Sequence, residues 1–332
     1  MAIAVVAGCT HDDTAAKVTP PVVSAPATPE TAPLAKGSAG SGVGSAAGSA
    51  APVASGDPWA AKPVQKDPLK RVMMWSATKA GHTTYFLGTM HLGVDAEARM
   101  PDIVWKDFAA APAFAMETDL TSPAAMKMAT DIQRTSGTLH DDLGPAYWKK
   151  LQDALTPAVA KQVDHMKPFA PVTFLSMKGL PQTAPMDSVL RGRAETEHKQ
   201  LVFLEDAAID EAILEKWMDV KALKEMLDDL ADTEKRQGEM LTAYLAGDDA
   251  RLLALSDDER ASAIKNGYTA AEYDAELDDL LYHRNASWIP ALEKLHAAGG
   301  GFVAVGCLHL IGPKSVLELL KKDGFTVTRI EP

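Results

Sequence analysis

Two histidines far apart in the chain follow the same local pattern. Three apolar or aromatic residues, a glycine, two further residues and a histidine occur at 85–91 and again at 303–309. We expect a buried strand to deliver each histidine to a sheet edge, where glycine permits a sharp departure of the chain and where open α/β sheets bind ligands. Neutral imidazole suits Zn, Mn, Co or Fe. The pattern favours His91 and His309 as ligands of one divalent cation, although a histidine beside an apolar strand is also commonly structural.

The bare Gly-x-x-His spacing is a weak signal, because the chain has 23 glycines and 9 histidines. A third copy at 137–140 ends in His140, but polar residues precede it and a helical stretch follows. We interpret this copy as unrelated to the site.

Two glutamates also end short apolar runs. Glu117 and Glu205 each follow a predicted strand, and burying a glutamate is costly unless it is paired or bound to a metal. We favour Glu117 as the carboxylate ligand and Glu205 as a further ligand or the general base. The alternative is that both are solvated residues at strand ends, and the nearby Asp119 and Asp206 are possible substitutes.

Arg284 and Asn285 are adjacent in a predicted helix. An arginine there would hold a developing oxyanion or a substrate carboxylate, with Asn285 orienting it. The alternative for Arg284 is a structural ion pair on a solvated helix. Cys307 lies two residues before His309; its thiolate is a possible zinc ligand, but we favour a small buried residue.

The elements that position these residues follow from the apolar pattern. Short apolar runs predict a β-hairpin at 72–78 and 83–88 and strands at 113–116, 201–204, 302–305 and 325–330. Helical spacing predicts helices at 211–237, at 257–296 with a break near Pro290, and at 314–322. We therefore predict an α/β fold with a mixed central sheet and a largely helical middle insertion.

The N-terminal region differs in composition from the rest. Small residues precede Cys9 and resemble the end of a bacterial lipoprotein signal, although the apolar stretch is short and lacks Lys or Arg. We expect a truncated signal at 1–9 with lipidation of Cys9, a disordered Ala/Pro/Gly/Ser tether at 10–58, and a single α/β domain at 59–332. This organisation predicts a periplasmic or cell-envelope protein that reaches the membrane only through its lipid, and the alternative is a plain cytosolic N-terminus.

The net charge of the 332 residues is -12. So acidic a chain is a poor binder of the phosphate backbone, and we expect no nucleic-acid partner.

The two histidine motifs together resemble the signature of the TraB/PrgY/GumN family. Glu117, Glu205 and the pair Arg284-Asn285 match acidic and Arg-Asn positions of that family, and the resemblance spans roughly residues 70 to 330. It implies two related halves, each carrying one Gly-x-x-His motif, and similarity to the TIKI metalloproteases, which are metal-dependent and use the two motif histidines. The chain departs from bacterial relatives at Cys307, where alanine is common.

These observations favour a metal-dependent hydrolase that acts on a peptide or small-molecule substrate and uses a divalent ion (Mn, Co, Zn or Fe). The alternative is a non-catalytic tethered module that binds or sequesters a peptide or small ligand; a scaffold in an envelope assembly is a weaker third interpretation. The metal-dependent hypothesis requires His91 and His309 to lie close together in the folded chain.

Overall fold

Six strands form one mixed sheet in the computed structural model, which describes residues 65–331. The sheet has the order β4-β3-β5-β2-β1-β6. The strands are β1 (Met74–Lys79), β2 (His82–Thr89), β3 (Ala113–Thr118), β4 (Gln200–Glu205), β5 (Phe302–Gly306) and β6 (Thr326–Arg329). The predicted α/β class with a mixed central sheet is thus confirmed.

The first two strands form the predicted hairpin. Lys79 pairs with His82, and the two residues between them, Ala80 and Gly81, have φ of 50° and 84°. Positive φ at both positions is the geometry of a two-residue turn that matches the twist of the flanking strands.

Strand direction brings the two histidine motifs to the same edge. β2 is parallel to β5, β5 to β3, and β3 to β4, so the carboxyl ends of these four strands meet at one edge of the sheet. In the β2–β5 register Gly88 lies opposite Val305 and Thr89 opposite Gly306. The strands that lead to His91 and His309 are therefore direct neighbours. β1 and β6 complete the sheet in antiparallel pairing.

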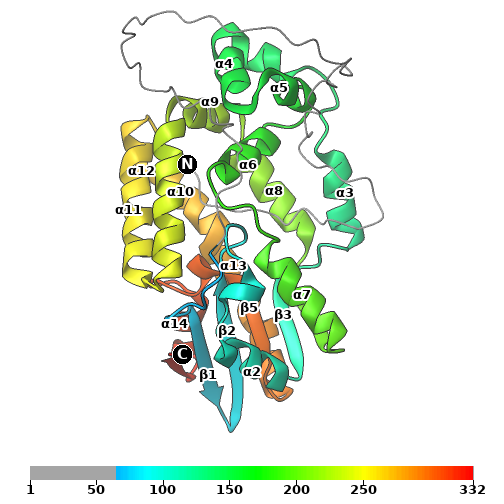
Figure 1. Ribbon diagram of the computed structural model, residues 1–332, viewed down its shortest axis with the longest axis vertical. Coiled ribbons are helices and arrows are strands. Elements are labelled where there is room, and N and C mark those ends of the chain that lie inside the picture. Colours follow the sequence, from blue (N-terminus) through cyan, green and yellow to red (C-terminus); the bar gives the residue numbers. More distant parts are fainter. Residues whose placement is uncertain (1–64, 332) are drawn as a thin grey trace, which may run out of the picture. The chain divides into compact units, whose positions relative to one another are not determined.

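Helices occupy most of the chain between β3 and β5, as predicted for the middle insertion (Figure 1). Two short helices connect β2 to β3, namely α1 (Ala96–Arg99) and α2 (Asp102–Ala110). Five helices connect β3 to β4, namely α3 (Pro123–Asp131), α4 (Leu139–Leu155), α5 (Pro157–Val163), α6 (Phe169–Met177) and α7 (Met186–Thr196).

The segment from β4 to β5 is also helical. It comprises α8 (Ala207–Trp217), α9 (Val220–Asp228), α10 (Leu230–Leu245), α11 (Asp249–Lys265), α12 (Ala270–Leu277), the π-helical turn η1 (Asp278–Tyr282) and α13 (His283–Ala297). After β5 come the 3-10 turn η2 (Cys307–His309) and α14 (Val316–Lys322).

The described residues bury two main apolar cores. The larger one surrounds the sheet and includes Phe108, Phe114 and Phe302. The second lies among α4, α5, α6 and α9 and includes Leu151 and Leu223, and Figure 1 shows these helices beyond the carboxyl ends of the strands. The insertion thus has packing of its own on the side of the sheet where the motifs end.

Two long helices predicted from apolar spacing are interrupted. The stretch 211–237 divides into α8, α9 and α10, because Asp219 caps α9 by accepting a hydrogen bond from the Ala222 amide. The stretch 257–296 breaks at 266–269 rather than near Pro290, which lies inside α13. Pro290 and Ala286, whose carbonyl loses its helical donor, are both exposed, so water can satisfy that carbonyl.

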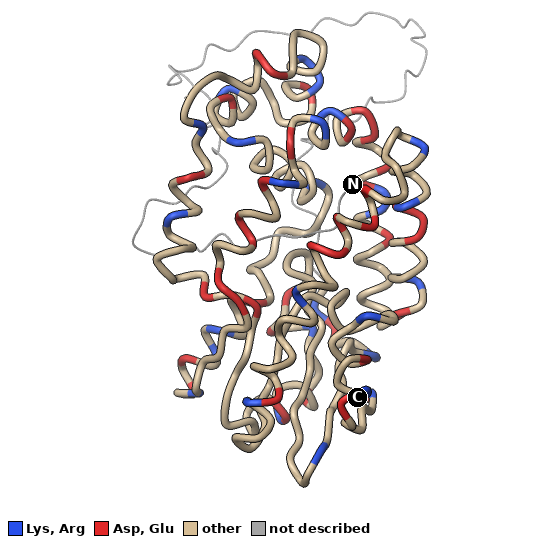
Figure 2. The backbone as a smooth tube through the Cα atoms, turned by 180° about the vertical axis from the view of Figure 1, so that it is seen from behind, with Lys and Arg blue, Asp and Glu red and all other residues tan. Residues whose placement is uncertain are grey.

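The predicted signal at 1–9, the lipidation of Cys9 and the tether at 10–58 all lie outside the described residues. Within residues 65–331 no helix is both long and apolar enough to span a bilayer. Lysine and arginine positions are interspersed with aspartate and glutamate positions along the described backbone (Figure 2).

Candidate metal centre

His91 lies just beyond the end of β2, and one of its ring nitrogens is already committed. Its Nδ1 is 2.6 Å from Oδ2 of Asp187 on α7. A carboxylate accepts, so Nδ1 carries a proton that it donates to Asp187, and Nε2 is the nitrogen that could bind a metal once it has lost its own proton. Burial lowers the pKa of His91, but the Asp187 carboxylate outweighs that effect and raises the pKa to about 9.

His309 ends η2, directly after β5, and is held in the corresponding way. Its Nδ1 is 2.7 Å from Oδ1 of Asn285, and Nδ2 of Asn285 donates to the Lys314 carbonyl at 3.0 Å. The second bond fixes the orientation of the amide, so Nδ1 of His309 donates. Burial lowers the pKa of His309 to about 3, and the neutral ring leaves a lone pair on Nε2.

Glu117, near the end of β3, lies between the two histidines. Its Oε1 accepts a hydrogen bond from the Gly306 amide at 2.7 Å and is 3.9 Å from Nε2 of His309. Its Oε2 accepts from Arg284 at 2.7 Å. Burial raises the pKa of Glu117, but His309, Arg284 and His91 together lower it to about 2, so the side chain is an anion.

Gly306 marks the point where the three side chains converge. A Cβ atom on Gly306 would lie 3.4 Å from His91 Nε2, 3.5 Å from Glu117 Oε1 and 3.5 Å from His309 Cδ2. The missing side chain therefore leaves a small space bordered by two imidazoles and a carboxylate. The structure thus brings the two motif histidines and Glu117 together, and their role as metal ligands stays a prediction.

This donor set fits a divalent cation. Two imidazole nitrogens with fixed Nδ1 protons and one carboxylate oxygen suit Zn, Mn, Co or Fe, and oxygen or nitrogen partners on each Nδ1 are the usual outer contacts of metal-bound histidine. Ligands that share an ion at about 2.1 Å lie roughly 3 to 4 Å apart, which includes the distance from Glu117 to His309. Within residues 65–331, however, no group of three or more histidine, cysteine, aspartate or glutamate side chains is arranged so that it could hold a metal ion, so these side chains would have to move to bind one.

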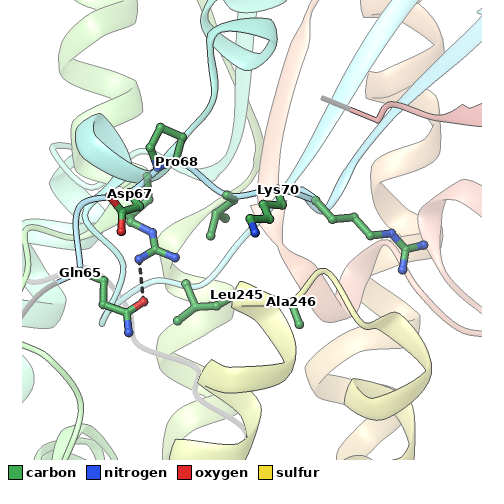
Figure 3. A pocket seen from close by; sticks show the side chains of 9 residues that line it. Gln65, Asp67, Pro68, Lys70, Leu245 and Ala246 are labelled. Atoms are coloured by element: carbon green, nitrogen blue, oxygen red, sulfur yellow. Dashed lines mark hydrogen bonds between the residues drawn. The ribbon is translucent and has the colours of Figure 1, made fainter.

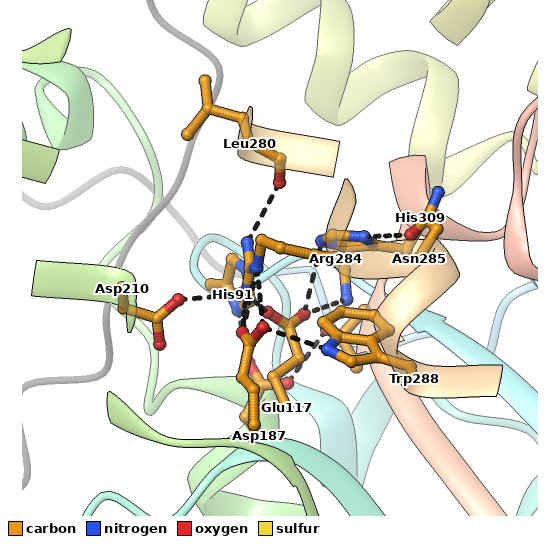
Figure 4. Close-up of polar contacts among 12 residues, drawn as sticks. His91, Glu117, Asp187, Asp210, Leu280, Arg284, Asn285, Trp288 and His309 are labelled. Carbon is orange, nitrogen blue, oxygen red and sulfur yellow. Dashed lines mark hydrogen bonds and ion pairs between the residues drawn. The ribbon is translucent and has the colours of Figure 1, made fainter. Parts of the chain in front are cut away.

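Arg284 gathers three carboxylates beside this space (Figure 4). Its Nε is 2.9 Å from Glu205 Oε1, and its Nη2 contacts Glu117 and, at 3.0 Å, Asp210. Glu205 also accepts from the indole of Trp288 at 3.0 Å. The side chain of Glu205 is only 2% exposed, against 12% for Asp210. Both oxygens of Glu205 are thus engaged with Arg284 and Trp288.

A π-helical turn directly precedes Arg284 and Asn285. Nη1 of Arg284 donates to the Leu280 carbonyl in this turn at 3.1 Å, and both Arg284 and Asn285 are buried. Single π-helical turns recur at functional sites. Here the turn leads into α13, where Arg284 donates a hydrogen bond to Glu117 and Asn285 accepts one from His309.

Other sequence candidates lie elsewhere. Asp119 pairs with Arg191 at 3.0 Å, and Asp206 caps α8. His140 is exposed on α4 and stacks against Trp148, which agrees with its interpretation as unrelated. Cys307 is buried and packs behind Gly88, where a Cβ would lie 2.9 Å from its Cα.

Sequence reasoning missed Asp187 and Asp210. Each lies in the first turn of a helix, α7 and α8 respectively. Acidic residues are common there because they complement the helix dipole, so neither position stands out. Asn285 was expected to orient Arg284, whereas its side chain forms hydrogen bonds with His309 and with the Lys314 carbonyl.

A cavity of about 380 Å³ lies elsewhere in the described chain (Figure 3). Residues before β1 and at the end of α10 line it, and Arg99 donates to Gln65 at its wall at 2.9 Å. None of the residues that line this cavity belongs to the histidine cluster.

Comparison with known proteins gives one match. No curated protein and no solved structure matches the chain. The TraB/PrgY/gumN family matches it over residues 73–329, a span that includes both histidine motifs, Glu117 and Arg284. Since that span covers well over half of the sequence, the chain belongs to the TraB/PrgY/gumN family.

Proposed function

We propose that this protein is a metal-dependent hydrolase that acts on peptides. The observation that carries the proposal is the convergence of His91, His309 and Glu117 around the space at Gly306. Two histidines and one carboxylate are a common ligand set for catalytic metals, and they leave a position open for water or substrate.

Each of the three proposed ligands is oriented or charged in its own way. Asp187 and Asn285 direct Nε2 of His91 and of His309 toward the site, and Glu117 supplies the negative charge. A bound divalent ion would supply Lewis acidity, which activates water and polarises a scissile carbonyl.

Arg284 supplies the positive charge for an oxyanion that develops during hydrolysis. Its guanidinium lies beside Glu117 and is buried with an exposed fraction of 5% for the side chain. Glu205 accepts from it and holds it in place, and the indole of Trp288 in turn donates to Glu205. These contacts favour Glu205 as the anchor of Arg284 over the roles of ligand or general base.

Asp210 is the carboxyl group that best suits proton transfer. It contacts Arg284 but is more exposed than Glu205. Burial raises the pKa of Asp210 above its ordinary value, with Glu205 and Glu117 adding to the effect against Arg284. In the proposed reaction Asp210 therefore carries a proton that it can donate to the leaving group.

Location at the envelope is a separate part of the proposal, and it rests on the sequence around Cys9. Replacing Cys9 with serine should abolish lipid labelling in a bacterial host. Retention of the label by the variant would contradict anchoring at Cys9.

Metal analysis of the purified protein tests the centre. We expect one divalent ion per chain in the wild type and loss of most of it in His91→Ala and His309→Ala. His140→Ala is the matched control, because His140 follows the same Gly-x-x spacing but is exposed on α4. Equal metal content in all four proteins would contradict the assignment.

Hydrolysis is tested by incubating the metal-loaded protein with a set of defined peptides and following them by mass spectrometry. New fragments that require His91 and His309 support the hydrolase. Peptides that bind tightly but return intact would support the alternative, a tethered module that sequesters its ligand.

A further inference from the structure

The loop that carries His91 is held by a helix from the insertion. Asp187, in the first turn of α7, uses both of its carboxylate oxygens on this loop. Oδ1 accepts from the hydroxyl of Thr89 at 3.0 Å, and Oδ2 accepts from Nδ1 of His91 at 2.6 Å. Asp187 itself is 8% exposed, so these two bonds satisfy an otherwise costly buried charge.

The residue before Asp187 contributes two more contacts to the same loop. The Met186 amide donates to the His91 carbonyl at 3.1 Å. The Met90 amide lies 3.4 Å from the sulfur of Met186. Two consecutive residues at the start of α7 therefore contact three consecutive residues, 89–91, through both side chains and backbone.

The two histidines are anchored by different parts of the fold. His309 receives its partner, Asn285, from α13, which precedes β5 directly. His91 receives its partner from α7, which belongs to the helical insertion and precedes β4. The orientation of His91 thus depends on the position of α7 against the sheet edge, whereas that of His309 does not.

We propose that Asp187, with Met186, forms a clamp that couples the seating of α7 to metal binding at His91. This inference rests on the metal site proposed above. Asp187 is a positioning residue: it holds the proton on Nδ1 of His91 and directs Nε2 toward Gly306. Because coupling between two events is reciprocal, a bound ion stabilises the seating of α7, and loss of the clamp weakens the binding of the ion.

Metal affinity is the first test. Zn²⁺ and Mn²⁺ are titrated separately into the metal-free full chain by calorimetry. We expect Asp187→Ala to weaken binding about 10- to 100-fold, the usual effect of removing an outer partner of a histidine ligand. Asp102→Ala is the matched control, since Asp102 is an exposed acid in the first turn of α2. Its affinity should equal that of the wild type.

Hydrogen exchange tests the coupling itself. Metal should slow amide exchange in α7 of the wild type and of Asp102→Ala, but not in Asp187→Ala. Should Asp187→Ala fail to fold, Thr89→Val provides a milder variant, because it removes one donor to Asp187 and retains the shape of the side chain. We expect Thr89→Val to bind metal more weakly than the wild type and to show reduced protection of α7.

The outcomes separate the clamp from the proposed function. Wild-type affinity in Asp187→Ala, or metal-dependent protection of α7 that persists in that variant, overturns the clamp while the metal site stands. A wild-type protein that binds neither ion overturns both the metal site and the clamp.

Discussion

The imidazoles of His91 and His309 border the same backbone position. A Cβ on Gly306 would lie 3.4 Å from Nε2 of His91 and 3.5 Å from Cδ2 of His309. This relationship follows from the parallel pairing of β2 with β5, which places the two motifs in register. The two motif glycines differ in what surrounds them: Gly306 borders the two histidines, whereas Gly88 packs against Cys307.

Replacing Gly306 with alanine should weaken metal binding, whereas replacing Gly88 with alanine should lower the stability of the fold. In Gly306→Ala the added methyl group fits in ordinary contact but occupies the space between the ligands, and φ of -49° suits alanine. We expect near-normal stability and metal affinity reduced by at least about tenfold, a loss of about 1.4 kcal/mol.

In Gly88→Ala the methyl group would lie 2.9 Å from Cα of Cys307. A backbone atom cannot move aside cheaply, so we expect destabilisation of about 1 to 3 kcal/mol. Urea unfolding and metal titration of both variants check the pair. If the two variants changed stability and metal affinity to the same extent, the separate roles of Gly306 and Gly88 would be contradicted.

Metal binding should release one proton near neutral pH. The pKa of His91 is about 9, so its ring is charged in the metal-free protein, whereas the pKa of His309 is about 3 and that of Glu117 about 2. Only His91 must therefore lose a proton to bind. Calorimetry in two buffers with different ionisation enthalpies measures the number released.

Affinity should accordingly rise about tenfold per pH unit as the pH approaches the pKa of His91. Asp187→Asn removes the charge that raises this pKa, so it should reduce proton release at neutral pH. Release of no proton, or of two, by the wild type would contradict the assignment of charges.

The stability of the metal-free protein should fall in both acid and alkaline solution. The pKa of Glu117 falls from 4.5 to about 2 on folding, so its contribution is present above pH 4.5 and is lost as the pH falls toward 2. The pKa of His91 rises from 6.5 to about 9, so its contribution is present below pH 6.5 and is lost as the pH rises toward 9.

The free energy of unfolding, measured in urea across this pH range, checks both the loss in acid and the loss in alkaline solution. Glu117 should account for about 3 kcal/mol of the stability lost in acid, and Glu117→Gln should remove that part. The low pKa of His309 adds to the same loss, since its ring must be protonated below pH 6.5 on unfolding. A wild-type profile that is flat from acid to alkaline pH would contradict both shifts.

Removal of Arg284 should destabilise the fold strongly. Arg284 lies among the carboxylates of Glu117, Glu205 and Asp210, and truncating one partner of a buried charge cluster typically costs about 3 to 5 kcal/mol. We expect this loss for Arg284→Ala in urea unfolding. Adding Glu205→Gln to Arg284→Ala should recover part of it, because one uncompensated charge disappears. A loss of similar size in the double variant would contradict the role of charge.

Cys307 should act as a packing residue rather than a ligand. Burial raises the pKa of its thiol to about 12, and the residue is 6% exposed. In a Cys9→Ser background, which leaves Cys307 as the single thiol, we expect no reaction with a thiol reagent in the native protein and rapid reaction after unfolding. Cys307→Ala should retain wild-type metal content, and a loss of metal from that variant would instead indicate a thiolate ligand.

Local pattern was sufficient to find the strands and the residues at their ends. Apolar runs followed by glycine, histidine or glutamate carry their signal within a few residues, and both histidine motifs lie where the pattern placed them. Helix boundaries were harder to predict. Asp219 interrupts an apolar period that continues on both sides, and Pro290 lies inside α13 at an exposed position, where water can satisfy the carbonyl that lacks a donor.

The sequence alone determined the candidate residues, since two histidines, a carboxylate and an arginine stand in recognisable local settings. Only the tertiary structure decided which nitrogen of each histidine is free, because that choice depends on Asp187 and Asn285. It also decided that Glu205 serves Arg284. Such pairings join residues far apart in the chain, and no local spacing records them: they arise only when the insertion packs against the carboxyl ends of the strands.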